Sequence, residues 1–145
     1  MGKLSRNTHL VLQTWYVDMY FTKCQEDQLM KCLTPKSYAG ERCPNLALGK
    51  PIVQSSTLNG PSLAVDGDNS KDVNSCAQTD SQIRPYIEVD LKGSYDIAII
   101  TIQNVDDACC YARMRELQVL SSEDQLVWNI CASYVPIVGQ GELLT

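Results

Sequence analysis

The sequence predicts an all-β protein built as a β-sandwich or jelly roll. Short apolar segments recur from Asn45 onward, and turn-forming residues separate them about every 8 to 12 residues. One segment, Tyr86–Leu91, alternates apolar and polar side chains as a half-buried strand does. No stretch after residue 45 shows the helical period of apolar residues. These observations predict short strands that pack in two layers.

Each strand expected after residue 45 has its own signal in composition. Apolar and β-branched residues favour a strand, whereas Gly, Pro, Asn and Ser favour the turns at 58–61, 92–94 and 121–125. A polar loop at 63–76 follows the first turn, and the run at 97–102 is apolar enough for a central strand. The expected strands are Pro51–Ser56, Tyr86–Leu91, Ile97–Ile102, Leu117–Leu120 and Leu126–Trp128.

Residues 1–43 differ in character from the rest and form an unassigned N-terminal extension. Their two apolar patches have no clean period, and a short helix is expected at Glu26–Leu33. The stretch 34–44 contains Pro and Gly and resembles a linker. The extension is a remnant of an upstream domain, a misassigned exon or an extra strand pair. The domain division is therefore 1–43 and 44–145.

Composition excludes several classes of function. The chain has 145 residues, 12 basic against 17 acidic side chains and a net charge of −5, so it lacks the basic face that nucleic acids and anionic membranes require. No apolar run reaches the roughly 18 to 20 residues needed to span a bilayer. The single histidine, His9, excludes metal sites that need two histidines.

The cysteines indicate an oxidising compartment and hence a secreted protein. An odd number leaves at least one thiol without a partner inside the chain. Adjacent Cα atoms lie about 3.8 Å apart and ordinary disulfides need roughly 4.4 to 6.8 Å, so a bond between the neighbours Cys109 and Cys110 closes a twisted ring that is rigid, flat and apolar. Alternatively, these two residues pair elsewhere or stay reduced. The seven cysteines are Cys24, Cys32, Cys43, Cys76, Cys109, Cys110 and Cys131.

A set of motifs from Asn45 to the end occurs in a characteristic order and spacing. They are Asn45–Ser56, Ala64–Asp68, Asn74–Cys76, Ile87–Leu91, Ile99–Asn104 and Asp107–Arg113. In this order they resemble the F-type lectin (fucolectin) family, a branch of the discoidin-like, galactose-binding-like β-sandwiches. The resemblance implies an all-β discoidin-like fold and calcium-dependent binding of L-fucose-type glycans.

The resemblance also implies a sugar site. In the family, one histidine and two arginines donate hydrogen bonds, and a vicinal disulfide packs on the apolar edge of the sugar. Arg113 matches the second arginine, and Cys109 and Cys110 match the disulfide. The family histidine falls on Gln78, whose amide still donates, and the first arginine falls near Val105 or Asp106, which do not. We therefore expect weakened, altered or absent fucose binding. The alternative for Arg113 is a surface arginine paired with Glu116.

The polar loop matches the calcium-binding loop of the family. Calcium takes 6 to 8 oxygen ligands, including backbone carbonyls. Asp66 matches the side-chain ligand, and the other ligands act through their backbone. The alternative is an Asp-Gly turn with solvated acids. The expected calcium ligands are Leu63, Asp66, Asp68, Ser75 and Cys76.

The resemblance further implies that the family's last strands, and one glutamate ligand, lie beyond Thr145. The family partners of Cys76 and Cys131 belong to those strands. Either the three N-terminal cysteines substitute for them, or Cys76 and Cys131 are orphans. We therefore expect this chain to be a fragmentary or divergent gene product.

Three functions compete. The first is a secreted lectin that recognises fucosylated or related glycans, for instance in innate defence, and that gains avidity as a homo-oligomer. The second is a non-catalytic, extracellular protein-interaction module without sugar binding, because a discoidin-like fold does not imply function. The third, an enzyme, is disfavoured: a reactive cysteine needs a base, and His9 lies in a segment of different character.

Overall fold

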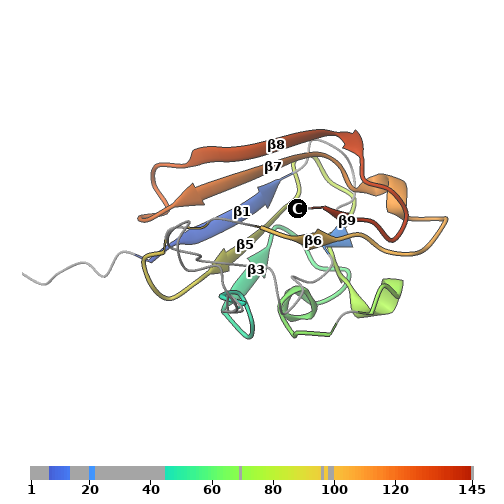
Figure 1. The fold of residues 1–145 in the computed structure, drawn as a ribbon, viewed down its shortest axis with the longest axis horizontal. Helices are drawn as coiled ribbons and strands as arrows, with labels where there is room; N and C mark the ends of the chain where they lie inside the picture. Colours follow the sequence, from blue (N-terminus) through green and yellow to red (C-terminus); the bar gives the residue numbers. More distant parts are fainter. Residues whose placement is uncertain are drawn as a thin grey trace, which may run out of the picture.

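A five-stranded antiparallel sheet dominates the computed structural model, which describes residues 7–13, 20–21, 45–68, 70–95, 97 and 100–144. The strand order is β3-β5-β1-β7-β8 (Figure 1). Each of the four neighbouring pairs is antiparallel. The strands are β1 (His9–Gln13), β3 (Ile52–Gln54), β5 (Tyr86–Asp90), β7 (Arg115–Ser122) and β8 (Asn129–Ile137).

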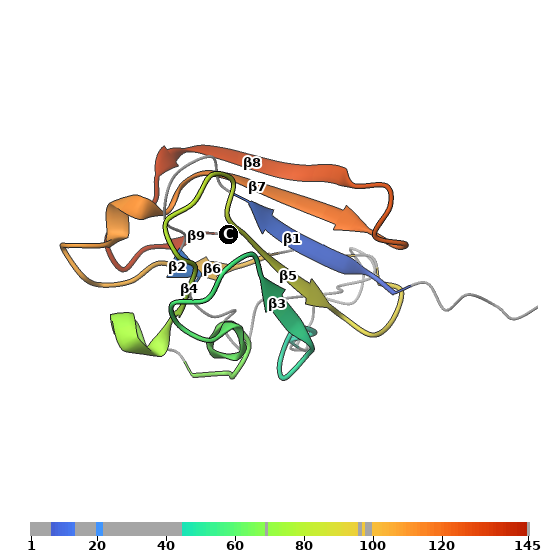
Figure 2. The same cartoon turned by 180° about the vertical axis from the view of Figure 1, so that it is seen from behind.

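Two short strand pairs lie beside the main sheet. Figure 1 shows β6 and β9 to the right of β1 and β5, and Figure 2 shows the same elements from behind. No described residue lies in an α-helix, which confirms the predicted all-β class. The described chain also contains no helix with the length and apolarity to cross a bilayer. The remaining elements are β2 (Tyr20–Phe21) with β4 (Ala77–Gln78), β6 (Ile102–Gln103) with β9 (Leu143–Leu144), and the 3₁₀ turns η1 (Pro61–Ala64), η2 (Val73–Ser75) and η3 (Tyr111–Arg113).

The core lies between the main sheet and the β6–β9 pair. Side chains alternate along β5, so Ile87 and Val89 are buried while Tyr86 and Glu88 face the other side. Ile102 of β6 joins the same cluster from the second layer. Both layers thus bury apolar side chains against each other, as a sandwich requires.

Strand β1 comes from the range that the sequence left unassigned, and it occupies the middle of the main sheet. It pairs with β5 on one side and with β7 on the other. Its residues Leu10 and Leu12 are part of the core. β2 also comes from residues 1–43, and it pairs with β4 rather than with β1.

Two predicted strands differ from the observed ones. The strand expected at Leu126–Trp128 is wrong: these residues belong to the turn before β8, with Leu126 84% exposed. The strand expected at Ile97–Ile102 is shorter, because β6 begins only at Ile102 and pairs with a strand of two residues. The expected strands near residues 51, 86 and 117 match β3, β5 and β7. The expected helix at Glu26–Leu33 and the linker at 34–44 lie outside the described residues.

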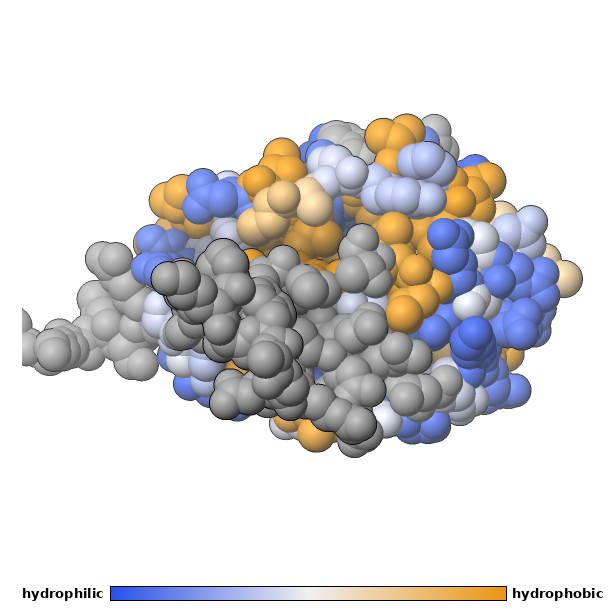
Figure 3. Space-filling model, viewed as in Figure 1, coloured by the Kyte–Doolittle hydropathy of each residue, from blue (hydrophilic) through white to orange (hydrophobic). Residues whose placement is uncertain are grey.

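Strand β8 forms one edge of the main sheet and is largely exposed. Its large apolar side chains Ile130, Val135 and Ile137 are 60%, 72% and 46% exposed. Figure 3 shows apolar residues along the upper border of the molecule, where Figure 1 places β8. Because β8 is exposed on nearly its whole length, its sequence lacks the clean alternation that would have predicted it.

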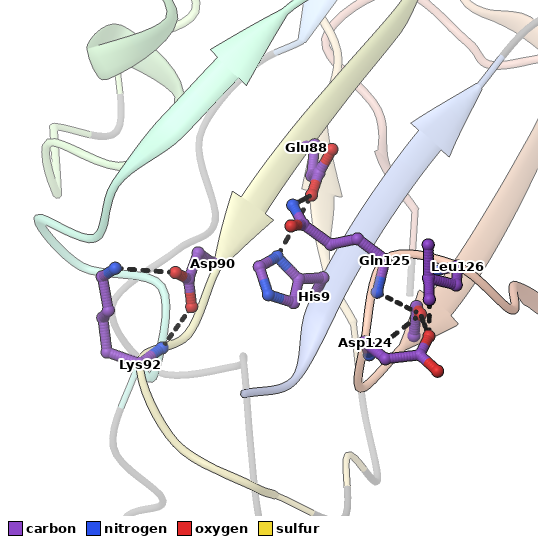
Figure 4. Close-up of polar contacts among 8 residues, drawn as sticks. His9, Glu88, Asp90, Lys92, Asp124, Gln125 and Leu126 are labelled. Atoms are coloured by element: carbon purple, nitrogen blue, oxygen red, sulfur yellow. Dashed lines mark hydrogen bonds and ion pairs between the residues drawn. The ribbon is translucent and has the colours of Figure 1, made fainter. Parts of the chain in front are cut away.

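The turn between β7 and β8 is organised by Asp124. Its carboxylate accepts the backbone N–H of Val127 at 3.0 Å and of Leu126 at 2.8 Å, which lowers the pKa of Asp124 below its ordinary value of 3.8 (Figure 4). The pKa of Asp90, at the same end of the sheet, is also lowered from its ordinary value. Burial raises the pKa of Asp90, but the bonds from Lys92 outweigh this and lower it.

We predict that the stabilising effect of the Asp124 carboxylate depends on pH. A carboxylate with a lowered folded-state pKa stabilises the fold above its unfolded-state pKa, and this contribution is lost as the pH falls through the folded-state value. The Asp124→Asn variant should therefore have a lower melting temperature than the wild type at pH 7, and this difference should shrink below about pH 4. Thermal melts between pH 7 and 2.5 measure the difference in melting temperature. An unchanged difference at pH 2.5 would contradict the prediction, and Asp80→Asn, an exposed acid elsewhere, is the control.

Candidate functional site

The adjacent cysteines form a disulfide on a loop that ends in η3. The structure joins Cys109 to Cys110, whose Cα atoms lie 3.7 Å apart. Asp107 shapes the loop, because its carboxylate accepts the Cys109 N–H at 2.8 Å and its carbonyl accepts the Cys110 N–H at 3.1 Å. Cys109 is exposed and Cys110 is 4% exposed. The disulfide thus presents one face to solvent and is anchored by the other.

Asn104 ties this loop to the segment between β8 and β9. Its side chain is fully buried, and its amide nitrogen lies 3.0 Å from the Tyr111 carbonyl and 2.9 Å from the Val138 carbonyl. Its amide oxygen accepts the Val105 N–H at 2.9 Å. Gly139 provides a third carbonyl at 3.1 Å. One side chain therefore holds together three segments that are separate in the sequence.

The disulfide loop also packs against the polar loop that precedes β4. Cys110, Val105 and Cys76 form a small buried cluster, with Val73 and Tyr111 packed against it. The backbone N–H of Asp106 bonds the Lys71 carbonyl at 3.0 Å. The two loops that the sequence singled out for sugar and for calcium therefore lie side by side.

The sugar-site candidates differ in accessibility. Arg113 lies in η3 and is partly exposed, and its backbone N–H bonds the Cys110 carbonyl at 3.1 Å. Gln78 is 6% exposed, which leaves little of it for a ligand to reach. Val105 is fully buried, and Asp106 is exposed and accepts from the Gln140 amide at 3.0 Å. Arg113 thus lies in the turn that follows the disulfide and is partly exposed, whereas the Gln78 side chain is buried.

The calcium candidates lie on η1, η2 and the turn between them. Asp66 and Asp68 are exposed, and each accepts a backbone N–H two residues ahead, at 2.9 Å and 2.8 Å. Leu63 and Ser75 are partly buried, and Cys76 is buried with its thiol 3.0 Å from the Asp72 carbonyl. Carboxylate and carbonyl oxygens are hard donors of the kind calcium prefers, so the donor set fits that ion. The Asx turns fit equally the alternative of an ordinary Asp-Gly turn.

A second group of potential metal ligands does not suit a metal. Asp107, Cys109 and Cys110 bring a carboxylate and two sulfurs together within the described part of the chain. Metal binding by cysteine requires a thiolate, and both sulfurs are spent in the disulfide. The two alternatives for the unpaired cysteines, orphan thiols or pairing with the N-terminal cysteines, involve different parts of the chain. The exposed Cys131 carries a thiol that lies 3.1 Å from the Ser121 hydroxyl. Substitution by Cys24, Cys32 or Cys43 lies outside the described residues.

Sequence reasoning missed the residues that support the site. Gln103 and Asn104 follow an apolar run directly, and a polar pair in that position was the available signal. The Gln103 amide lies 3.0 Å from the Gly141 carbonyl, and Lys71 reaches the same carbonyl at 3.0 Å. These bonds hold the segment after β8 against β6 and against the polar loop.

The model of a NedA-like, galactose-binding domain of the F5/F8 type C group matches residues 63–142. Fucolectin-5 of Anguilla japonica is 32% identical over 123 residues, which cover 77% of this chain and 63% of that protein. The match thus spans less than two thirds of the relative. No solved structure matches the chain.

Proposed function

Because the chain belongs to the F5/F8 type C family of NedA-like, galactose-binding domains and has a fucolectin-like discoidin fold, we propose that it is a lectin that binds L-fucose-type glycans through the surface formed by Arg113 and the Cys109–Cys110 disulfide. The family and the fucolectin relative support carbohydrate binding in general. Fucose as the ligand, calcium dependence and the absence of catalysis are parts of the proposal.

The observation that carries the proposal is the position of Arg113 beside the disulfide. A guanidinium fork donates two hydrogen bonds to neighbouring hydroxyls, and an apolar plate covers the C–H face of a sugar ring. Arg113 is partly exposed three residues after Cys110, and Cys109 is exposed on the same loop. Gln78 is buried and the Val105 side chain has no hydrogen-bond donor, so two of the three polar anchors are weakened or lost and the proposed affinity is weak or the specificity altered.

Calcium is proposed as a structural ligand of the neighbouring loop. The ion would neutralise the acids and join the two ends of the loop, which stabilises the wall beside the disulfide. The residues that would hold it are Leu63, Asp66, Asp68, Ser75 and Cys76.

We further propose a secreted protein with a role in glycan recognition such as innate defence, which gains avidity as a homo-oligomer. The cysteine content and the disulfide support an oxidising compartment. The alternative is an extracellular protein-interaction module without sugar binding, and the burial of Gln78 and Val105 favours it.

Thermal melts in EDTA, in calcium, and in calcium with L-fucose test the proposal. A ligand that binds only the folded state stabilises it by about 2.7 kcal/mol at 100 times its Kd. We expect calcium to raise the midpoint and fucose to raise it again. Asp66→Asn should remove the calcium shift.

Arg113→Ala tests the sugar contact itself. Hydrogen bonds from a charged group contribute about 1.5 to 3 kcal/mol, so isothermal titration calorimetry should show fucose binding weakened by about 10- to 150-fold. Arg84→Ala, an exposed arginine elsewhere, is the matched control. A calcium shift without any fucose binding in the wild type would support the interaction module instead.

A further inference from the structure

The outer face of the main sheet carries a pocket that the proposed sugar site does not use. Side chains alternate along a strand, so Leu10 and Leu12 point into the core while Val11 and Gln13 point to the opposite face. The pocket on that face has a volume of about 370 Å³. Its sides come from β1, β5, β7 and the turn before β8. Its lining includes Gln13, Tyr86, Glu88, Gln125 and Trp128.

One wall of this pocket is held in place by hydrogen bonds. The Glu88 carboxylate accepts from the Gln125 amide at 2.5 Å, and the same oxygen lies 3.1 Å from the His9 Nδ1 (Figure 4). These contacts link the turn before β8 to β5 across β1. The polar wall therefore has a defined position before any ligand arrives, which lowers the cost of binding.

The pocket also offers unused hydrogen-bonding groups and aromatic surface. Among the described residues, the Gln13 amide, the Tyr86 hydroxyl and the Trp128 indole N–H have no hydrogen-bond partner. Tyr86 is 36% exposed and Trp128 is partly exposed. An exposed pocket that combines aromatic faces with a few convergent polar groups is a typical small-ligand site.

The chemistry of the lining selects the class of ligand. Among the described residues that line the pocket there is no lysine or arginine, and the chain carries a net charge of −5, so an anionic ligand is disfavoured. Amide, hydroxyl and indole groups pair with hydroxyls, and the aromatic rings cover C–H groups. A neutral sugar ring has both an edge of hydroxyls and an apolar face. We propose that this pocket is a second saccharide site, which takes a neutral hexose ring and works independently of Arg113; a galactoside serves as the probe.

Calorimetric titration of the full chain with methyl β-D-galactopyranoside tests the second site. Aromatic contact is the main contribution, so Trp128→Ala should weaken binding by at least about 10-fold. Gln13→Leu should weaken it too, because it removes hydrogen bonds and keeps the side-chain size. Leu126→Ala, an exposed residue of the same turn, should leave the affinity unchanged.

Two comparisons make the test decisive. Arg113→Ala should leave galactoside binding at the outer face intact, whatever it does to fucose, so the two proposals fail separately. Choline chloride is the second probe, because aromatic rings beside a carboxylate also suit a quaternary ammonium ion. Binding of choline but not of the galactoside would overturn the inference. So would galactoside binding that neither Trp128→Ala nor Gln13→Leu changes while both variants melt cooperatively.

Discussion

Replacing Leu10 with aspartate should abolish the cooperative unfolding of this chain. Leu10 is 4% exposed and belongs to β1, the strand that joins β5 to β7. An unpaired carboxylate in this position costs about 4 kcal/mol or more, which is a large share of the roughly 5 to 15 kcal/mol that stabilises a typical domain. Differential scanning calorimetry and circular dichroism in the near ultraviolet measure the loss.

The matched control for Leu10→Asp is Val53→Asp. Val53 lies in the same sheet, on the edge strand β3, and is 55% exposed. The same chemical change there should cost at most about 1 kcal/mol. A Leu10→Asp variant that melts as cooperatively as Val53→Asp would show that β1 is not an integral strand of the sheet.

The second large effect is expected for Asn104→Ala. The substitution leaves the Val105 N–H and the carbonyls of Tyr111 and Val138 without the partner that satisfies them in a buried position. Each unsatisfied group costs about 1 to 3 kcal/mol, so we expect a loss of about 3 kcal/mol in chemical denaturation. The loop should also loosen, and dithiothreitol should reduce the Cys109–Cys110 disulfide faster.

Asn74→Ala is the control for this prediction. Asn74 is exposed in η2, and the bond that it contributes comes from its backbone N–H, which the substitution keeps. The free energy of unfolding of the Asn74→Ala variant should differ from that of the wild type by no more than about 0.5 kcal/mol. Equal losses in both variants, or an unchanged rate of disulfide reduction in Asn104→Ala, would argue against the anchoring role of Asn104.

Sequence reasoning recovers strands whose two faces differ. Tyr86–Leu91 alternates because one face of β5 is buried and the other is not, and the pattern is visible in the chain. Strand β1 has no such pattern. Four of its five residues are buried, because it lies between two strands and the turn before β8 covers part of its outer face. Only the long-range pairing of residues 9–13 reveals it as a strand.

The site was predictable only in part for a related reason. The adjacent cysteines, Arg113 and the acidic loop are local motifs, and the structure brings Cys76 and Cys110 into one cluster. The burial of Gln78 depends on how β4 packs, which no local pattern records. Asn104 likewise gains its importance from carbonyls more than 30 residues away, such as that of Val138 at a separation of 34.

The central position of β1 has a consequence for how the chain folds. His9 contacts Glu88 at a sequence separation of 79, and Thr8 bonds Tyr95 at a separation of 87. Contacts between distant segments make folding slow, because loop closure must precede any gain from pairing. During synthesis β1 leaves the ribosome before both of its partners, since β5 begins only at Tyr86 and β7 at Arg115. The nascent chain therefore carries an apolar strand that waits for its neighbours, and its yield should depend on chaperones that shield such a segment.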